Sequence, residues 1–122
     1  MTEHAKQILD LLVTKTTSKE ITWQKASGTN QYKMQFQNGA AITISYSYAA
    51  NTTGGSTSTV YYIIYNEKGS VVEKNNVTKS NPDYQKLKDL YDLIGRIDRK
   101  EDETFSSIIN ELKSKGNQSA GN

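Results

Sequence analysis

The chain has 122 residues, a size typical of one domain, and its net charge is only +2. Because cysteine is absent and His4 is the single histidine, the composition excludes a disulfide scaffold, a thiolate metal site and a triad built on several histidines. The balanced charge also argues against DNA or RNA polymers as ligands, since their binding domains carry a basic stripe.

The localisation prediction comes from two absent signals. No stretch of the sequence is apolar for long enough to span a membrane, and the first residues lack the basic and apolar regions of a secretory signal. We therefore expect a cytoplasmic protein that does not enter a membrane.

The first segment, residues 3–16, has apolar side chains at helical spacing. Thr2 precedes it and can cap its first turn. An N-terminal helix is therefore expected. The apolar stripe of this helix is Ala5, Ile8, Leu9, Leu12 and Val13.

The middle of the chain predicts strands, because apolar and polar residues alternate there. Asn38-Gly39 is a strong hairpin signal, since both turn residues accept positive φ. Most of the eight tyrosines fall in these segments. The expected strands cover residues 21–25, 32–36, 42–48, 60–65 and, more weakly, 71–75.

Residues 49–59 are small, polar and glycine-containing, which predicts a flexible hairpin loop. A lid that closes over a ligand is the alternative interpretation. By contrast, the strand at 60–65 is apolar on both faces, so protein or a partner should cover each of them.

After Pro82 the sequence returns to helical spacing, interrupted by a charged run at residues 96–103. One bent helix and two helices are both compatible with this pattern. Gly116 is expected to end the last helix, with 117–122 as a flexible tail. The two apolar stripes are Tyr84, Leu87, Leu90, Tyr91, Ile94 and Ile97, then Phe105, Ile108, Ile109 and Leu112.

These elements predict a single α+β domain over residues 1–116. It has a five-stranded antiparallel sheet (meander), an N-terminal helix and one or two C-terminal helices. We expect the helices to cover one face of the sheet. The other face, with one side of strand 60–65 and Thr, Ser, Gln and Lys side chains, is the first place to look for function.

Catalytic and metal-binding signals are weak. The sequence has no phosphate-binding glycine loop, so no nucleotide cofactor is expected. Asp98 and Asp102 could share a helix face, but Arg96, Arg99 and Lys100 lie among them, which favours a solvated ion-pair ladder over a metal site. We therefore predict no catalytic residue, no metal and no cofactor.

Ligand-binding candidates come from side chains that bind phosphate or stack on rings. Arg96 and Arg99 are the only arginines, and the guanidinium group suits bidentate phosphate recognition. Gly95 beside them could permit close approach of a backbone or ligand. Tyr91 continues the same helix as a possible stacking residue. The alternative is that the arginines are solvated and Tyr91 belongs to the core.

Trp23 and Tyr61 are the strand residues that could stack on a base. A lone tryptophan on a strand is also a common core anchor whose indole N–H finds an acceptor. Both interpretations of Trp23 are kept here.

Four segments carry a resemblance to a known family. They are the Trp23 strand, Tyr32…Phe36-Gln37-Asn38-Gly39, Tyr61…Tyr65-Asn66-Glu67-Lys68-Gly69 and Leu87…Leu90-Tyr91-Asp92-Leu93-Ile94…Arg96. This layout, over roughly residues 5–112, resembles a family of small helix–sheet–helix proteins of bacteria, prophages and mobile elements. Some phage proteins of similar make-up are anti-defence sponges, oligomers that sequester nucleotide second messengers. The resemblance implies a viral protein in the host cytosol, a homo-oligomer and a small nucleotide ligand.

Two functional hypotheses follow, and neither involves catalysis. In the first, the chain captures a nucleotide signal, with Arg96 and Arg99 on phosphate and Tyr91, Trp23 or Tyr61 on the base. In the second, it is a protein-binding inhibitor or immunity module that uses the tyrosine-rich sheet face. A deep pocket lined by Arg and Tyr would support the first hypothesis, and a flat aromatic patch the second. A structural subunit of a phage particle is a third possibility.

Overall fold

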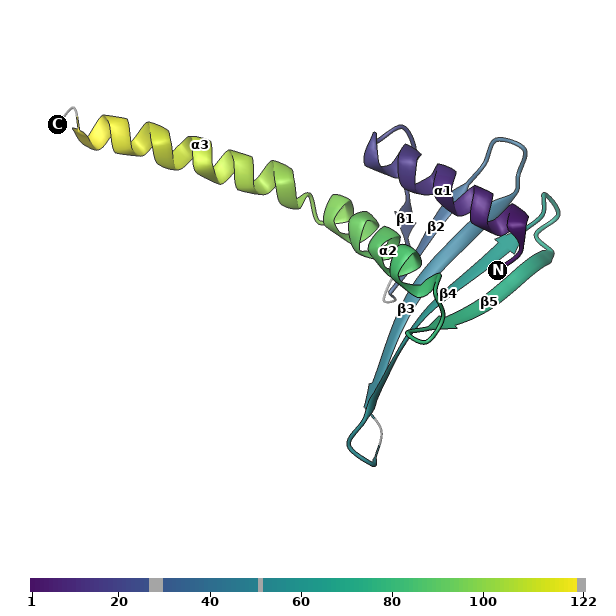
Figure 1. The fold of residues 1–122 in the computed structure, drawn as a ribbon. Helices are drawn as coiled ribbons and strands as arrows, with labels where there is room; N and C mark the ends of the chain where they lie inside the picture. The colour runs from purple at the N-terminus through teal and green to yellow at the C-terminus, as the bar shows by residue number, and fades with distance from the viewer. Residues whose placement is uncertain (27–29, 51, 121–122) are drawn as a thin grey trace.

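The computed structural model describes residues 1–26, 30–50 and 52–120, and Figure 1 shows its elements. Helix α1 precedes an antiparallel sheet of five strands in the order β1-β2-β3-β4-β5, and α2 and α3 follow the sheet. The α+β meander expected from the sequence is therefore confirmed. The bounds are α1 Glu3–Thr17, β1 Gln24–Lys25, β2 Gln31–Gln35, β3 Ala41–Ala50, β4 Ser56–Tyr65, β5 Val71–Thr78, α2 Tyr84–Asp98 and α3 Glu101–Ala120.

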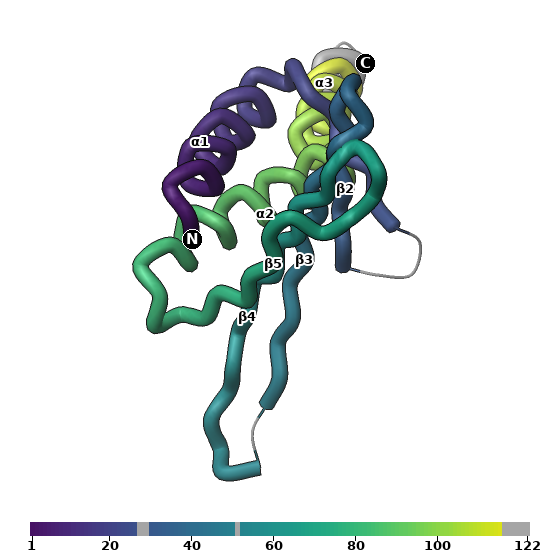
Figure 2. The backbone as a smooth tube through the Cα atoms, turned by 90° about the vertical axis from the view of Figure 1, so that its right-hand side faces the viewer, coloured from purple at the N-terminus to yellow at the C-terminus, as the bar shows by residue number. Residues whose placement is uncertain are grey.

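Helices α1 and α2 lie on the same side of the sheet, as Figure 2 shows. The Thr2 side chain accepts a hydrogen bond of 3.1 Å from the Ala5 N–H and so caps α1, as the sequence predicts. The buried apolar side chains form one cluster between these helices and the sheet. Its members are Ala5, Leu9, Leu12, Tyr32, Ile42, Ile44, Val60, Tyr62, Val77, Tyr84, Leu87, Leu90 and Ile94.

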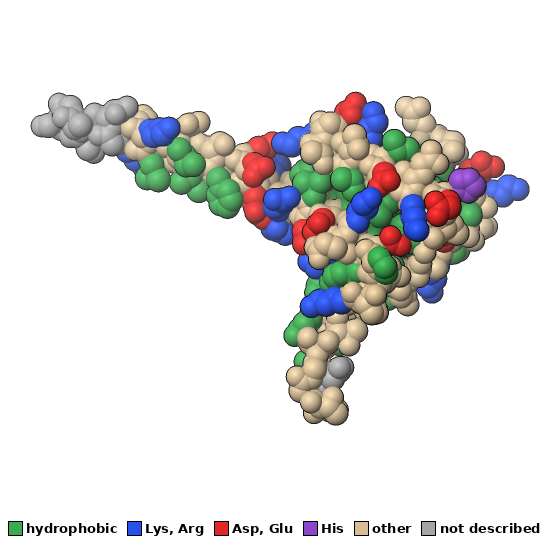
Figure 3. Space-filling model, viewed as in Figure 1, with side chains coloured by type: hydrophobic (Ala, Val, Ile, Leu, Met, Phe, Trp, Pro, Cys, Tyr) green, Lys and Arg blue, Asp and Glu red, His purple; other side chains and the backbone are tan. Residues whose placement is uncertain are grey.

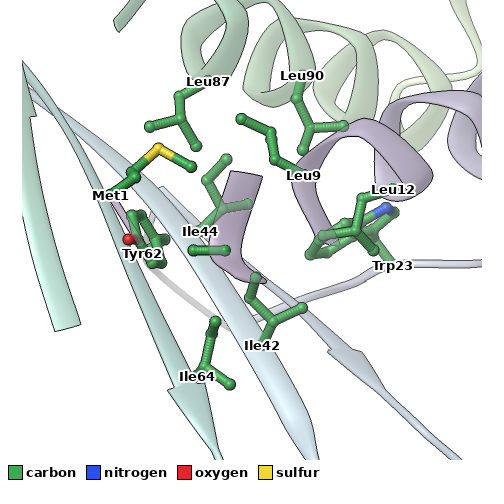
Figure 4. A pocket seen from close by; sticks show the side chains of 11 residues that line it. Met1, Leu9, Leu12, Trp23, Ile42, Ile44, Tyr62, Ile64, Leu87 and Leu90 are labelled. Atoms are coloured by element: carbon green, nitrogen blue, oxygen red, sulfur yellow. The ribbon is translucent and has the colours of Figure 1, made fainter. Parts of the chain in front are cut away.

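A small gap remains in this core beside Met1, and Figure 4 shows the side chains around it. The gap holds only about 10 Å³ and its walls are apolar. A cavity of that size takes at most one water molecule, and a water needs polar partners. The gap is a packing defect and not a ligand site.

The first strand is shorter than expected. The alternation over residues 21–25 predicts a strand, but only Gln24–Lys25 pairs with β2. Trp23, just before this strand, is held against α1 because its indole N–H donates to the Thr16 Oγ1 at 3.0 Å. The chain enters the sheet only after this anchor.

The prediction of a loop at residues 49–59 is largely wrong. Strand β3 continues to Ala50 and β4 begins at Ser56, so most of this segment is a two-stranded ribbon that extends beyond the rest of the sheet (Figure 1). The ladder pairs Ala49 with Thr57 and Ala50 with Ser56. Threonine favours extended backbone through its β-branch, and this preference outweighs the small polar composition. Residue 51 lies outside the described residues.

The C-terminal segment forms two helices. They are separated at Arg99 and Lys100, and Lys100 has a φ of 54°. Residues 96–103 are charged except for Ile97, so little apolar surface is available to pack a continuous helix across this junction. Helix α3 continues to Ala120, so the end predicted at Gly116 is wrong, because a glycine inside a helix costs only about 1 kcal/mol. Residues 121–122 of the predicted tail lie outside the described residues.

Candidate functional site

The ligand-binding candidates do not converge on one cavity. Trp23 is half-buried between the end of α1 and the sheet, where Thr16 satisfies its N–H. The side chain also lines the small core gap described above. Trp23 therefore packs against the core as an anchor, the alternative that the sequence left open, and its exposed side lines a separate pocket of about 270 Å³ that contains no arginine or tyrosine.

Tyr91 is half-buried between α2 and the sheet. Its ring packs against Tyr32 at a centroid distance of 5.5 Å and against Tyr46 at 5.6 Å. The Lys88 ammonium lies 4.6 Å from the centre of the Tyr46 ring. Burial, then the neighbouring Tyr32 and Asp92, raises the pKa of Tyr91. Two protein rings therefore already pack against Tyr91, in tilted contacts that compete with stacking on a base.

Arg99 lies at the end of α2 and turns back toward Gly95. A Cβ at position 95 would lie 3.1 Å from the Arg99 Nη1 and 3.4 Å from the Tyr32 hydroxyl. The Arg99 Nε donates to Glu101 at 2.8 Å, and this hydrogen bond raises the pKa of Arg99. Gly95 thus does permit a close approach, but the group that approaches is a side chain of this protein.

Arg96 is exposed on the outer side of α2, away from the sheet. It lines a shallow depression of about 130 Å³ in which carboxylates stand beside the cations. A phosphate group would meet those carboxylates as well as the arginine. The other described residues of this depression are Lys19, Leu93, Ile97, Lys100, Glu101, Asp102 and Glu103.

Tyr61 lies on the opposite face of the sheet from these residues. Side chains alternate along a strand, and Tyr62 is in the core beneath the helices, so Tyr61 points to the face that α1 and α2 leave open. Tyr61 therefore cannot share a ligand with Trp23 or Tyr91. We call this side of the sheet the open face.

The strand register defines the open face. Side chains from four strands align there in cross-strand rows, and the central row joins Lys33, Thr43, Ile63 and Lys74. The flanking rows are Gln35, Ala41, Tyr65 and Val71 on one side and Gln31, Ser45, Tyr61 and Asn76 on the other.

A ridge and a groove run side by side on this face. The ridge consists of Tyr61, Ile63 and Tyr65 along β4, all half-buried. Small side chains of β3 form the floor beside it, and Ala41 and Thr43 are each only 5% exposed. The longer side chains of β2 form the far wall. The groove has a volume of about 480 Å³ and is lined by Gln31, Lys33, Gln35, Gly39, Ala41, Thr43, Tyr65, Asn66, Glu67, Lys68 and Gly69.

One end of the groove is closed by two hairpin turns. Gly39 lies in the β2–β3 turn with a φ of 93°, and a Cβ there would come within 3.4 Å of the Glu67 carbonyl oxygen. The positive φ favours glycine here, and a Cβ would make only an ordinary contact with the β4–β5 turn. The hairpin predicted at Asn38-Gly39 forms, although of these two residues only Gly39 has a positive φ, and it also shapes the groove.

The charged side chains at the described strand positions of the open face are all positive. Lys33 and Lys74 stand on either side of the ridge in the central row. None of the described strand positions of this face carries a carboxylate, and Glu67 with Lys68 lies at the turn. The face therefore combines an apolar ridge with positive charge.

The alternation of residues pointed to this face but not to its central row. Lys33 and Lys74 were not singled out, because one sequence does not give the register of distant strands. The Asn38-Gly39 turn does set Lys33 near Thr43, so part of the row could have been found from it.

Other kinds of site lack support. In the part of the chain that the structure describes, no helix could cross a membrane and no group of three or more His, Asp or Glu side chains could hold a metal ion. No protein-family model, curated protein or solved structure matches the chain.

Proposed function

We propose that this chain is a non-catalytic protein-binding module that holds an extended, acidic segment of a partner protein in the groove of its open face. The observation that carries the proposal is the central row, in which Lys33 and Lys74 flank Ile63 on an uncovered sheet. An inhibitor or immunity factor acting on another protein needs such a surface and no catalytic group.

The shape of the groove favours an extended chain. Its floor is made of small side chains, so a backbone can lie close to β3, and the ridge offers aromatic rings to apolar side chains of the ligand. Tyrosine is enriched among the interface residues that contribute most to binding. Lys33 and Lys74 then select for carboxylates on the partner.

The nucleotide-sequestering function implied by the resemblance requires Arg96, Arg99, Tyr91 and an aromatic strand residue around one ligand. These side chains occupy separate places, and Arg99 and Tyr91 already have protein partners. The open face offers rings and lysines together in one place. For this reason the protein-binding function is preferred.

A peptide-display selection against the full chain tests the proposal. We expect enrichment of segments that alternate aliphatic and acidic residues. Binding of the selected peptides, followed by fluorescence anisotropy, should weaken about tenfold or more in Lys33→Glu/Lys74→Glu at low salt and less at high salt. Tyr61→Ala should weaken binding by about 1–2 kcal/mol, the cost of truncating a moderate hot spot.

The matched control is Lys25→Glu/Lys79→Glu, which makes the same change of net charge at exposed lysines away from the open face. It should bind like the wild type. Selection of basic peptides, or equal losses in the two double variants, would contradict the proposal. A large rise in melting temperature with cyclic di- or trinucleotides would favour nucleotide capture instead.

A further inference from the structure

Helix α3 contacts the rest of the described chain mainly through the end of α2. It spans 20 residues, about 30 Å at 1.5 Å per residue, and projects away from the sheet and the other helices (Figure 1). Hydrophobic side chains gather along one side of it in Figure 3. They are Phe105, Ile108, Ile109 and Leu112, which are 56%, 49%, 50% and 63% exposed.

This stripe has the spacing of a helix–helix contact. The positions i, i+3, i+4 and i+7 lie on one face of a helix. Most helices in proteins gain their stability by packing such a face, and an exposed apolar surface of this kind marks an interaction site. Because none of the described residues covers this stripe, we look for its partner outside the chain.

The charges of α3 identify the partner. Its first turn is acidic, with Glu101, Asp102 and Glu103, and its later part carries Lys113 and Lys115 with one acid, Glu111, which pairs with Lys115 at 3.1 Å. A second α3 placed antiparallel meets this pattern with opposite charges. A parallel second helix would place acidic turn on acidic turn and lysine on lysine.

We propose that two copies of this chain dimerise through α3, antiparallel, about a two-fold axis between Ile108 and Ile109. Around that axis the isoleucines of the two copies meet, and Phe105 of each copy lies over Leu112 of the other. Helical geometry then sets Asp102 beside Lys113 of the second copy. It also brings Glu101 near Lys115, although these two already pair with Arg99 and Glu111 of their own chain, so the Asp102–Lys113 pair is the one that tests the arrangement. The same pairing opposes the two helix dipoles favourably.

The size of the contact sets its strength. Covering the exposed parts of four large apolar side chains on each copy removes roughly 600–800 Å² in total, against about 1,200 Å² for the smallest stable interfaces. The dimer is therefore concentration-dependent, with a Kd of roughly 1–100 µM. This inference goes beyond the open face, which lies on the sheet and takes no part in the contact.

Sedimentation equilibrium of the full chain across this concentration range tests dimerisation. Ile108→Glu/Ile109→Glu should raise the Kd at least 100-fold. The control Ser107→Glu/Ser114→Glu adds the same charge on the opposite side of α3 and should leave the Kd within about threefold. The near-ultraviolet circular dichroism of Trp23 reports whether the body stays folded. A wild type that is monomeric throughout, or equal effects of the two variants, overturns the proposal.

Two further measurements test the antiparallel arrangement. Asp102→Lys and Lys113→Asp should each weaken the dimer, whereas the two changes together should restore it to within about threefold of the wild type. Because the chain has no cysteine, a single introduced thiol reports its own neighbours. Ile108→Cys, beside the proposed axis, should form a disulfide-linked dimer on oxidation, and Leu112→Cys, on the same stripe one turn away, should not. Efficient linkage through position 112 would establish a parallel pair and overturn the antiparallel one.

Discussion

Tyr61 and Tyr62 are neighbours on β4, yet they belong to two different surfaces. Tyr62 is 2% exposed beneath the helices, and its hydroxyl donates to a Glu73 carboxylate oxygen. Tyr61 is half-buried on the open face, between Ser45 and Asn76. The same residue type therefore stabilises the fold on one face of the sheet and remains available to a partner on the other.

The largest expected effect is the difference in protein stability between the alanine variants of these two tyrosines. Tyr62→Ala should lower the free energy of unfolding by about 3–4 kcal/mol, because it leaves a cavity in the core and removes one of the two side-chain donors to Glu73. Tyr61→Ala should cost about 1 kcal/mol or less, since it removes only a half-buried side chain. Urea denaturation measures both values. Similar losses in the two variants would show that the open face is part of the folding core.

The second-largest expected effect is a loss of folding stability at alkaline pH, caused by ionisation of Tyr62. Burial, then the hydrogen bond to Glu73, raises the pKa of Tyr62 from 10.0 to about 12. The neutral phenol therefore stabilises the fold below pH 10, and this contribution is lost as the pH rises from about 10 to about 12. About two pKa units correspond to roughly 2–3 kcal/mol.

Denaturation at several alkaline pH values, with tyrosinate absorbance recorded in parallel, tests this prediction. Tyr62→Phe should flatten the loss of stability over that range. Tyr48→Phe is the matched control, because Tyr48 is 62% exposed on the same sheet. If Tyr48→Phe flattened the profile as much as Tyr62→Phe, the assignment to Tyr62 would be wrong.

The sequence predicts the helix-covered face well because periodicity reports burial. The stripe of α1 and most of the stripe of α2 lie in the core, and the hairpin at Asn38-Gly39 forms. The predicted boundaries of two strands were wrong because they depend on tertiary contacts, which periodicity does not encode. The strand pattern at residues 21–25 was cut short by Trp23 and Thr16, and the polar segment at 49–59 was drawn into the β3–β4 ladder.

The candidate site was harder to predict than the fold. Helical spacing marks Phe105 and Leu112 as one apolar face, but it does not say whether the chain itself covers that face. In the same way, residue types suggested Arg99 and Tyr91 as ligand groups, whereas tertiary contacts occupy both. The central row of the open face depends on register across four strands, which only the folded sheet gives.

The smallest predicted effect concerns the contact between Glu73 and the N-terminus, at the margin of the helix-covered face. Thr2 Oγ1 donates to Glu73 at 2.7 Å and also accepts from the Ala5 N–H. Burial acts to raise the pKa of Glu73, but the hydrogen bonds from Tyr62 and Thr2 and the N-terminal charge together hold this pKa below its ordinary value of 4.5. The ionised carboxylate therefore stabilises the fold above pH 4.5, and its contribution is lost as the pH falls through the lower folded-state pKa.

Thr2→Ala should thus lower the free energy of unfolding at neutral pH by about 1 kcal/mol, because α1 loses its cap and Glu73 loses a donor. The loss of stability on acidification should also become smaller than in the wild type. Thr2→Asn, which keeps a capping oxygen, should recover most of the neutral-pH stability. Urea denaturation of both variants from neutral to acidic pH measures this. An unchanged acid profile in Thr2→Ala would mean that Tyr62 and the N-terminal charge hold Glu73 ionised without the hydrogen bond from Thr2.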